Sequence, residues 1–236
     1  MKKHTIAIVL AAGQGKRMCT DVAKQFLDLN GEPVVCHSLR VFEKSPVERV
    51  ILVTGSDEVE YCRTEIVQKG GFSKVTDVVA GGKERYHSVY EGLRALSNWL
   101  SPEDLVLIHD GARPMVTLEI VERAIAAAAQ YGACVAAMPV KDTIKVADSD
   151  AFALTTPDRS TLWQIQTPQG FMYGLVYGAY SKLMSDTHLQ KGVTDDAMVV
   201  ESLTGNKVKL IEGSYENIKV TTPEDMLVAE VFLKKR

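Results

Sequence analysis

A glycine-rich segment near the N-terminus carries a high density of positive charge. Residues 10–26 read LAAGQGKRMCTDVAKQF, with a single acidic residue among the cations. The glycines and cations are Gly13, Gly15, Lys16, Arg17 and Lys24. Small residues let backbone N–H groups approach a ligand closely, and guanidinium and ammonium groups bind phosphate oxygens. This combination is suited to holding a polyphosphate.

Two common phosphate-binding loops do not fit this segment. A dinucleotide-binding loop requires G-x-G-x-x-G and an acidic residue about 20 positions later. Met18 stands at the third glycine position, and the acidic residue is missing at the end of a second strand. A P-loop requires G-x-x-x-x-G-K-[ST], but Leu10 and Arg17 occupy its first and last positions. A nucleotidyltransferase loop is the third possibility, and a tight turn bearing solvated cations is the alternative.

The composition narrows the class of protein. The chain has 236 residues, of which 46% are hydrophobic, and its formal net charge is −3. This length and apolar content suit one large α/β domain or two small ones. General nucleic-acid binding usually requires a basic surface, so no nucleic-acid partner is expected. A local cluster of cations would have to hold any anionic ligand.

The N-terminal segment and the cysteines indicate a cytoplasmic protein. The apolar run after MKKH has only about seven residues and leads into the glycine-rich loop, which predicts a core strand rather than a signal peptide. Every apolar run is shorter than the ~20 residues of a membrane span, so no membrane partner is expected. The cysteines lack CxxC and zinc-finger spacing and are expected to be reduced.

Short apolar runs alternate with amphipathic stretches along the chain. Strands are predicted over Thr5–Leu10, Arg49–Thr54, Val75–Ala80, Asp104–His109, Ala133–Pro139 and Lys207–Glu212. Helices are predicted over Pro33–Lys44, Lys83–Leu96, Leu118–Tyr131 and Pro223–Lys235. This alternation predicts an α/β fold with a doubly wound, mostly parallel sheet. Such sheets bind ligands at the carboxyl ends of their strands.

The segment 141–166 interrupts this alternation. It is polar, lacks a helical stripe, and alternates apolar and polar residues around Ile144–Val146 and Phe152–Leu154. We expect a β-hairpin arm that protrudes from the main sheet and packs on another subunit; a flexible surface loop is the alternative. The chain is thus predicted to be a single domain, 1–236, that includes the arm 141–166.

Several blocks of sequence resemble one enzyme family. AAGxGxRM followed by KQF resembles the sugar-nucleotide pyrophosphorylase and cytidylyltransferase superfamily. Further blocks resemble the 2-C-methyl-D-erythritol 4-phosphate cytidylyltransferases, in that family's order. They are AGGKERYHSVYEGL (80–93), VLIHDGARP (106–114), PVKDTIK (139–145), QTPQGF (166–171), VTDDAMVVE (193–201) and ENIKVTTPEDM (216–226). The alternatives are a ribitol-5-phosphate cytidylyltransferase, which shares many of these blocks, and a nucleotide-binding regulator without turnover.

The resemblance implies a reaction and an assembly. CMP would be transferred from CTP to 2-C-methyl-D-erythritol 4-phosphate, giving 4-diphosphocytidyl-2-C-methyl-D-erythritol and pyrophosphate in the non-mevalonate isoprenoid pathway. The sheet would be a Rossmann-like nucleotidyltransferase sheet, and the arm would complete the acceptor site of a partner subunit in a homodimer. A phosphate monoester is largely dianionic near neutral pH and needs no general base, so catalysis would depend on positioning and electrostatic stabilisation.

The resemblance also assigns roles to residues. At CTP it places Ala11, Ala12, Gly13, Gly15, Lys16, Arg17, Lys24, Gly82, Ser88 and Asp110. At the acceptor it places Asp110, Arg113, Thr143, Arg159, Thr167, Thr194 and Lys219. The catalytic residues among these would be Arg17, Lys24, Arg159 and Lys219. Asp110 is also the expected ligand of Mg²⁺ or another divalent cation, because an acid beside two polyanions needs an intervening cation. His109 is expected to be structural, since strand alternation points it to the other face.

Overall fold

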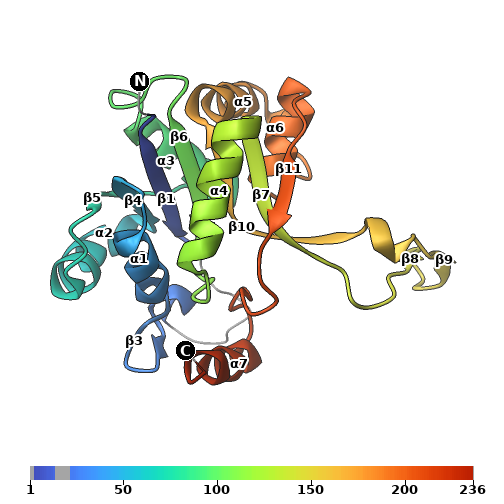
Figure 1. Ribbon diagram of the computed structural model, residues 1–236, viewed down its shortest axis with the longest axis horizontal. Helices are drawn as coiled ribbons and strands as arrows, with labels where there is room; N and C mark the ends of the chain where they lie inside the picture. The colour runs from blue at the N-terminus through green and yellow to red at the C-terminus, as the bar shows by residue number, and fades with distance from the viewer. Residues whose placement is uncertain (1–2, 14–21, 236) are drawn as a thin grey trace.

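The computed structural model describes residues 3–13 and 22–235 (Figure 1). Their central sheet has seven strands in the order β11-β7-β10-β6-β1-β4-β5. These strands are β1 (Thr5–Ala11), β4 (Arg49–Thr54), β5 (Val75–Ala80), β6 (Leu105–Asp110), β7 (Ala133–Pro139), β10 (Trp163–Met172) and β11 (Lys209–Glu212). Among the described strands of this sheet, only β10 pairs antiparallel with its neighbours, β6 and β7. The predicted doubly wound, mostly parallel sheet is confirmed.

Helices cover both faces of the sheet. One face packs against α1 (Val34–Lys44) and α4 (Leu118–Tyr131). The other face packs against α3 (Arg85–Ala95), α5 (Tyr173–Ser185) and α6 (Asp196–Thr204). Successive residues of β1 enter the two hydrophobic cores in turn, with Val9 in the first core and Ile8 in the second. Burial on both faces explains why several of the predicted strands are rich in Val and Ile and apolar on both faces.

The remaining elements are short or lie at the edges of the molecule. They are β2 (Asp28–Leu29), β3 (Glu32–Pro33), α2 (Val59–Tyr61), the π-helical Cys62–Gln68, and α7 (Pro223–Leu233). Short 3₁₀ helices occupy Lys24–Phe26, Ser56–Glu58, Arg159–Thr161 and Thr187–Gln190. Among the described residues, none of the helices combines the length and apolar character needed to span a membrane.

Strand β10 and helices α5 and α6 were not predicted. β10 reads WQIQTPQGFM, and its polar side chains conceal it from a search for apolar runs. Gln166, Thr167 and Gln169 are nevertheless buried and hydrogen-bonded. Trp163 already pairs with Pro139 of β7, so the last four residues of the segment 141–166 belong to the main sheet.

The segment after β7 extends away from the body of the molecule (Figure 1). Within it, β8 (Val146–Ala147) and β9 (Ala153–Thr155) pair antiparallel in a small sheet of their own. The apolar side chains of Phe152 and Leu154 are 71% and 66% exposed.

Candidate active site

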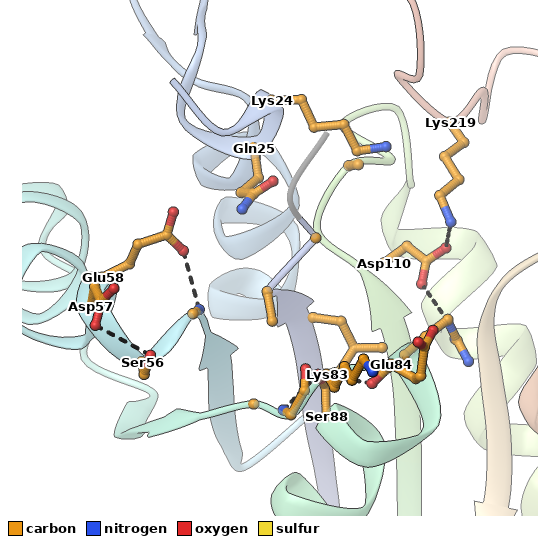
Figure 2. Close-up of a pocket in the computed structure, with 18 residues that line it drawn as sticks. Lys24, Gln25, Ser56, Asp57, Glu58, Lys83, Glu84, Ser88, Asp110 and Lys219 are labelled. Carbon is orange, nitrogen blue, oxygen red and sulfur yellow. Dashed lines mark hydrogen bonds and ion pairs between the residues drawn. The ribbon is translucent and has the colours of Figure 1, made fainter. Parts of the chain in front are cut away.

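A cleft of about 940 Å³ lies at the carboxyl ends of the parallel strands (Figure 2). β1 and β6 are neighbours, but the chain leaves β1 toward β4 and β5, and leaves β6 toward the opposite edge of the sheet. A doubly wound sheet binds its ligands at such a switch point. The segments after β1, β4, β5 and β6 all contribute to the wall, with residues 12–13, 55–58, 81–85 and 110.

The loop after β5 approaches the end of β1 closely because it contains glycine. A Cβ atom on Gly81 would lie 2.5 Å from Ser88 Oγ and 2.9 Å from Ala12 Cβ. The buried Ser88 hydroxyl accepts a hydrogen bond from Gly82 N at 3.2 Å. Ala12, Gly13, Gly82 and Ser88, all expected at CTP, therefore line one continuous surface of the cleft. Ala11 is buried at the end of β1 directly before this surface.

Lys24 and Lys219 both line the cleft, although 195 positions of sequence separate them. In Figure 2 they come from one side of the cleft, and Lys83, Glu84 and Ser88 come from the other. Lys24 Nζ donates to the carbonyl oxygen of Val220 at 2.8 Å, which ties the two lysine-bearing segments together. Two of the cations expected at the phosphates are thus placed at one wall of the cleft.

Asp110 ends β6 between two cations. Its carboxylate accepts from Lys219 Nζ at 2.7 Å on one oxygen and from Arg85 Nε at 3.2 Å on the other. Burial favours the neutral acid, but the charges of Arg85, Lys219 and Arg113 hold the pKa of Asp110 well below its ordinary value. Asp110 is therefore ionised at neutral pH.

A second cavity of about 280 Å³ adjoins the cleft. Arg85, Asp110 and Lys219 line both, so these three residues form a shared wall. The other residues of the second cavity are Arg113, Ile165, Gln166, Thr167, Gln169, Thr194 and Asp195. The structure thus brings together five of the residues expected at the acceptor, namely Asp110, Arg113, Thr167, Thr194 and Lys219.

The remaining predicted residues lie elsewhere. Thr143 and Arg159 are exposed in the segment between β7 and β10, and Arg159 Nη1 donates to Lys141 O at 2.7 Å. Within the single described chain, both lie outside the cleft and the second cavity. Gly15, Lys16 and Arg17 are outside the described residues, so their contacts stay predictions.

Sequence reasoning missed Arg85 and Asp196. The two Nη atoms of Arg85 each donate to one oxygen of Asp196 at 2.7 Å, across 111 positions of sequence. Both residues lie in blocks that carry the family resemblance, KER and TDDA. Strand and helix periodicity give no indication that the two side chains meet.

His109 contacts two residues that line the second cavity, Thr167 and Arg113. It is fully buried, with Nδ1 3.0 Å from Thr167 Oγ1 and Nε2 3.3 Å from the carbonyl oxygen of Arg113. Thr167 Oγ1 in turn accepts from the backbone N–H of Asp110 at 3.1 Å. Burial, together with the nearby cations, lowers the pKa of His109 to about 4. The residue is neutral and structural at pH 7, as its place in the strand predicted.

We expect His109 to make the fold sensitive to acid. The unfolded chain protonates this histidine below its ordinary pKa of 6.5, whereas the folded chain does so only near 4. Unfolding therefore takes up a proton between these values, and stability falls as the pH drops through this window. Between pH 7 and pH 5, the free energy of unfolding measured in urea should fall by about 2 kcal/mol more in the wild-type protein than in His109→Gln. An equal fall in the two proteins would contradict this role.

The described residues contain no group of three or more His, Cys, Asp or Glu side chains that could hold a metal ion by themselves. Mg²⁺ at nucleotide sites is commonly held by one or two carboxylates together with phosphate oxygens. Asp110 supplies one ionised carboxylate at the shared wall. A single ionised carboxylate of this kind can hold a divalent cation together with oxygen ligands from a bound substrate.

Known proteins resemble this chain over nearly its whole length. The family model for 2-C-methyl-D-erythritol 4-phosphate cytidylyltransferase matches residues 5–235. The enzyme of that name from Lachnospira eligens is 51% identical, over 97% of this chain and 98% of its own. The one from Alkaliphilus oremlandii is 48% identical, over 98% of this chain and 96% of its own. The crystal structure of 4-diphosphocytidyl-2C-methyl-D-erythritol synthase from Anaerococcus prevotii has a TM-score of 0.83 at 34% identity, covering 98% of this chain and 96% of that one.

Proposed function

The chain belongs to the 2-C-methyl-D-erythritol 4-phosphate cytidylyltransferase family, and we propose that its cleft and the adjoining cavity hold the two substrates of that family's reaction. The enzyme transfers CMP from CTP to 2-C-methyl-D-erythritol 4-phosphate in isoprenoid biosynthesis and releases pyrophosphate. The new bond joins an oxygen of the acceptor phosphate to the α-phosphorus of CTP, and the bond to pyrophosphate breaks.

CTP occupies the larger cleft in this proposal. The small residues Ala12, Gly13 and Gly82 leave room for the nucleotide beside the backbone, and Ser88 fixes the loop that carries Gly82. Lys24 lies at the same cleft and supplies charge for the triphosphate. Gly15, Lys16 and Arg17 would add backbone and side-chain donors to the phosphates.

Methylerythritol phosphate occupies the smaller cavity. Arg113 and Lys219 supply positive charge, and Thr167 and Thr194 supply hydroxyl groups to the wall of this cavity. The single observation that carries the proposal is the shared wall of Arg85, Asp110 and Lys219. A ligand in either space meets Lys219 there, so the two phosphates that react would come together at its ammonium group.

The chemistry requires charge stabilisation more than proton transfer. The attacking phosphate is itself an anionic nucleophile, and the five-coordinate transition state gathers negative charge on its equatorial oxygens. Lys24 and Lys219, with Arg17, would neutralise that charge from fixed positions. Mg²⁺ or another divalent cation, held by Asp110 and the triphosphate, would neutralise further charge and separate the Asp110 carboxylate from the phosphates.

We further propose a homodimer in which the arm completes the acceptor site of the partner. The exposed apolar side chains of Phe152 and Leu154 support this assembly. Thr143 and Arg159 lie on the same protruding segment, where they could approach a second copy of the chain. A guanidinium binds phosphate through two parallel hydrogen bonds, which suits Arg159 to the acceptor phosphate.

Subunit complementation tests this arrangement. Arg159→Ala and Lys219→Ala chains should each have very low activity alone, but mixing them should restore turnover. A mixed dimer has one site with both residues intact, and random mixing makes about half of the dimers mixed, so about one quarter of wild-type activity is expected. Absence of recovery, with subunit exchange demonstrated by labelled chains, would place Arg159 outside the partner's site.

Acceptor preference tests the function itself. Pyrophosphate release from CTP and Mg²⁺ should be rapid with 2-C-methyl-D-erythritol 4-phosphate and much slower with ribitol 5-phosphate. Preference for ribitol 5-phosphate would indicate that this chain is a ribitol-5-phosphate cytidylyltransferase. Release with neither acceptor would favour a regulator without turnover.

A further inference from the structure

We propose that Asp196 is a positioning residue for CMP transfer: it fixes the Arg85 guanidinium, which in turn fixes Asp110 and Lys219 at the shared wall. The inference rests on the proposed role of Lys219 at the reacting phosphates. Asp196 itself lies behind Arg85 and lines neither the cleft nor the second cavity among the described residues.

Asp196 is the first residue of α6 and is completely buried. Its carboxylate accepts both Nη groups of Arg85 at 2.7 Å, and the Tyr180 hydroxyl donates to Oδ1. A buried carboxylate is costly unless it is paired and hydrogen-bonded with good geometry. Here the planar fork of arginine meets both oxygens, which fixes the orientation of the guanidinium as well as its position.

The orientation of Arg85 determines where its remaining donor points. With both Nη groups on Asp196, Nε is directed at Asp110 Oδ1, 3.2 Å away. The other oxygen of Asp110 accepts from Lys219 Nζ at 2.7 Å. Four charged groups therefore follow one another, with two carboxylates alternating with two cations. Burial would lower the pKa of Arg85, but Asp196 and Asp110 raise it well above its ordinary value.

Hydrogen bonds fix the start of α6 relative to the central sheet, so Asp196 can hold Arg85 in a defined position. Asp195 caps the helix by accepting from Met198 N at 3.0 Å. Gln169 of β10 donates Nε2 to Asp195 Oδ2 at 3.0 Å and accepts from Ala197 N at 2.8 Å. Asp196 thus sits between two residues that are bonded to the central sheet. Arg85, in contrast, is 28% exposed and stands at the wall of both ligand spaces.

Asp196→Asn tests the inference while preserving the size of the side chain. The amide replaces one acceptor oxygen with an NH₂ donor that faces the guanidinium, so the bidentate contact with Arg85 is lost. We expect kcat to fall by on the order of 10- to 100-fold, the loss usual when a group that orients a site residue is removed. The matched control is Asp104→Asn. Asp104 is also buried and accepts two backbone hydrogen bonds, but it lies at the opposite end of β6. This control should lose stability while kcat stays at the wild-type value.

A double-mutant cycle separates positioning from a purely structural role. If Asp196 acts through Lys219, Asp196→Asn should change kcat by less than about 3-fold in a Lys219→Ala background, because coupled residues are not additive. The same fold-loss in both backgrounds, or wild-type kcat in a folded Asp196→Asn enzyme, would overturn the inference. Wild-type kcat in Lys219→Ala alone would overturn the proposed function together with it. Arg85→Lys serves in the same cycle if the Asp196→Asn chain does not fold, since one ammonium cannot hold both carboxylates.

Discussion

Replacing Lys219 with alanine is expected to lower kcat by on the order of 10²- to 10³-fold, the cost of removing one fixed charge-stabilising donor. Lys219 lies at the wall shared by the cleft and the second cavity, 2.7 Å from Asp110. Its ammonium group therefore lies where we propose that the acceptor phosphate and the α-phosphate meet. Because that charge matters most in the transition state, kcat should fall more than KM rises for either substrate.

Steady-state kinetics of pyrophosphate release, with each substrate varied in turn, measures this effect. Lys209→Ala provides a matched control. Lys209 is an exposed lysine of β11 whose ammonium lies over the Tyr131 ring, 5.5 Å from its centroid and outside both ligand spaces. The control should keep wild-type kinetics. Wild-type turnover in a folded Lys219→Ala enzyme would contradict the role assigned to this residue.

Replacing Lys24 with alanine is expected to lower kcat as much as replacing Lys219, but it should also affect KM. Lys24→Ala should lower kcat by on the order of 10²- to 10³-fold and also raise KM for CTP, because the ammonium faces the cleft proposed for the triphosphate. KM for the acceptor should change least.

Lys24→Met separates charge from packing. Lys24 Nζ also donates to Val220 O at 2.8 Å, so its loss could loosen the segment that carries Lys219. Alanine and methionine both remove this donor and the charge, but methionine keeps most of the apolar stem, and it should lose as much kcat as alanine. A methionine variant with turnover close to wild type would show that the stem, and not the charge, is what the reaction uses.

The fold was predicted best where a short run of β-branched or apolar residues, or a helical stripe, marks the element. The bounds of β4, β5, β7 and α4 agree with the prediction, and Gly132, which follows α4 as its C-cap, has a left-handed φ of 80°. β10 was missed because several of its buried residues, Gln166, Thr167 and Gln169, are polar and hydrogen-bonded. Gln166, for example, donates to the carbonyl oxygen of Ser214 at 2.7 Å. Such contacts join residues that are far apart in the sequence, so they produce no periodic pattern from which a strand could be predicted.

Some residues of the candidate site could likewise be predicted from the sequence, and others could not. Asp110 and Lys219 were found from their blocks of sequence and from the rule that ligands bind at the carboxyl ends of strands. The partner of Asp110, Arg85, lies on a different element, and its own partner Asp196 lies on yet another. Only the three-dimensional arrangement reveals that these four charges form one continuous set of contacts.

A crystal structure of the enzyme with 4-diphosphocytidyl-2-C-methyl-D-erythritol tests the central claim most directly, because we expect this product to span both ligand spaces. We predict the cytidine beside Gly82 and Ser88, the methylerythritol between Arg113 and Thr194, and the diphosphate at the wall of Asp110 and Lys219. A product bound with its diphosphate away from Lys219, or with both ends in the larger cleft, would contradict the account.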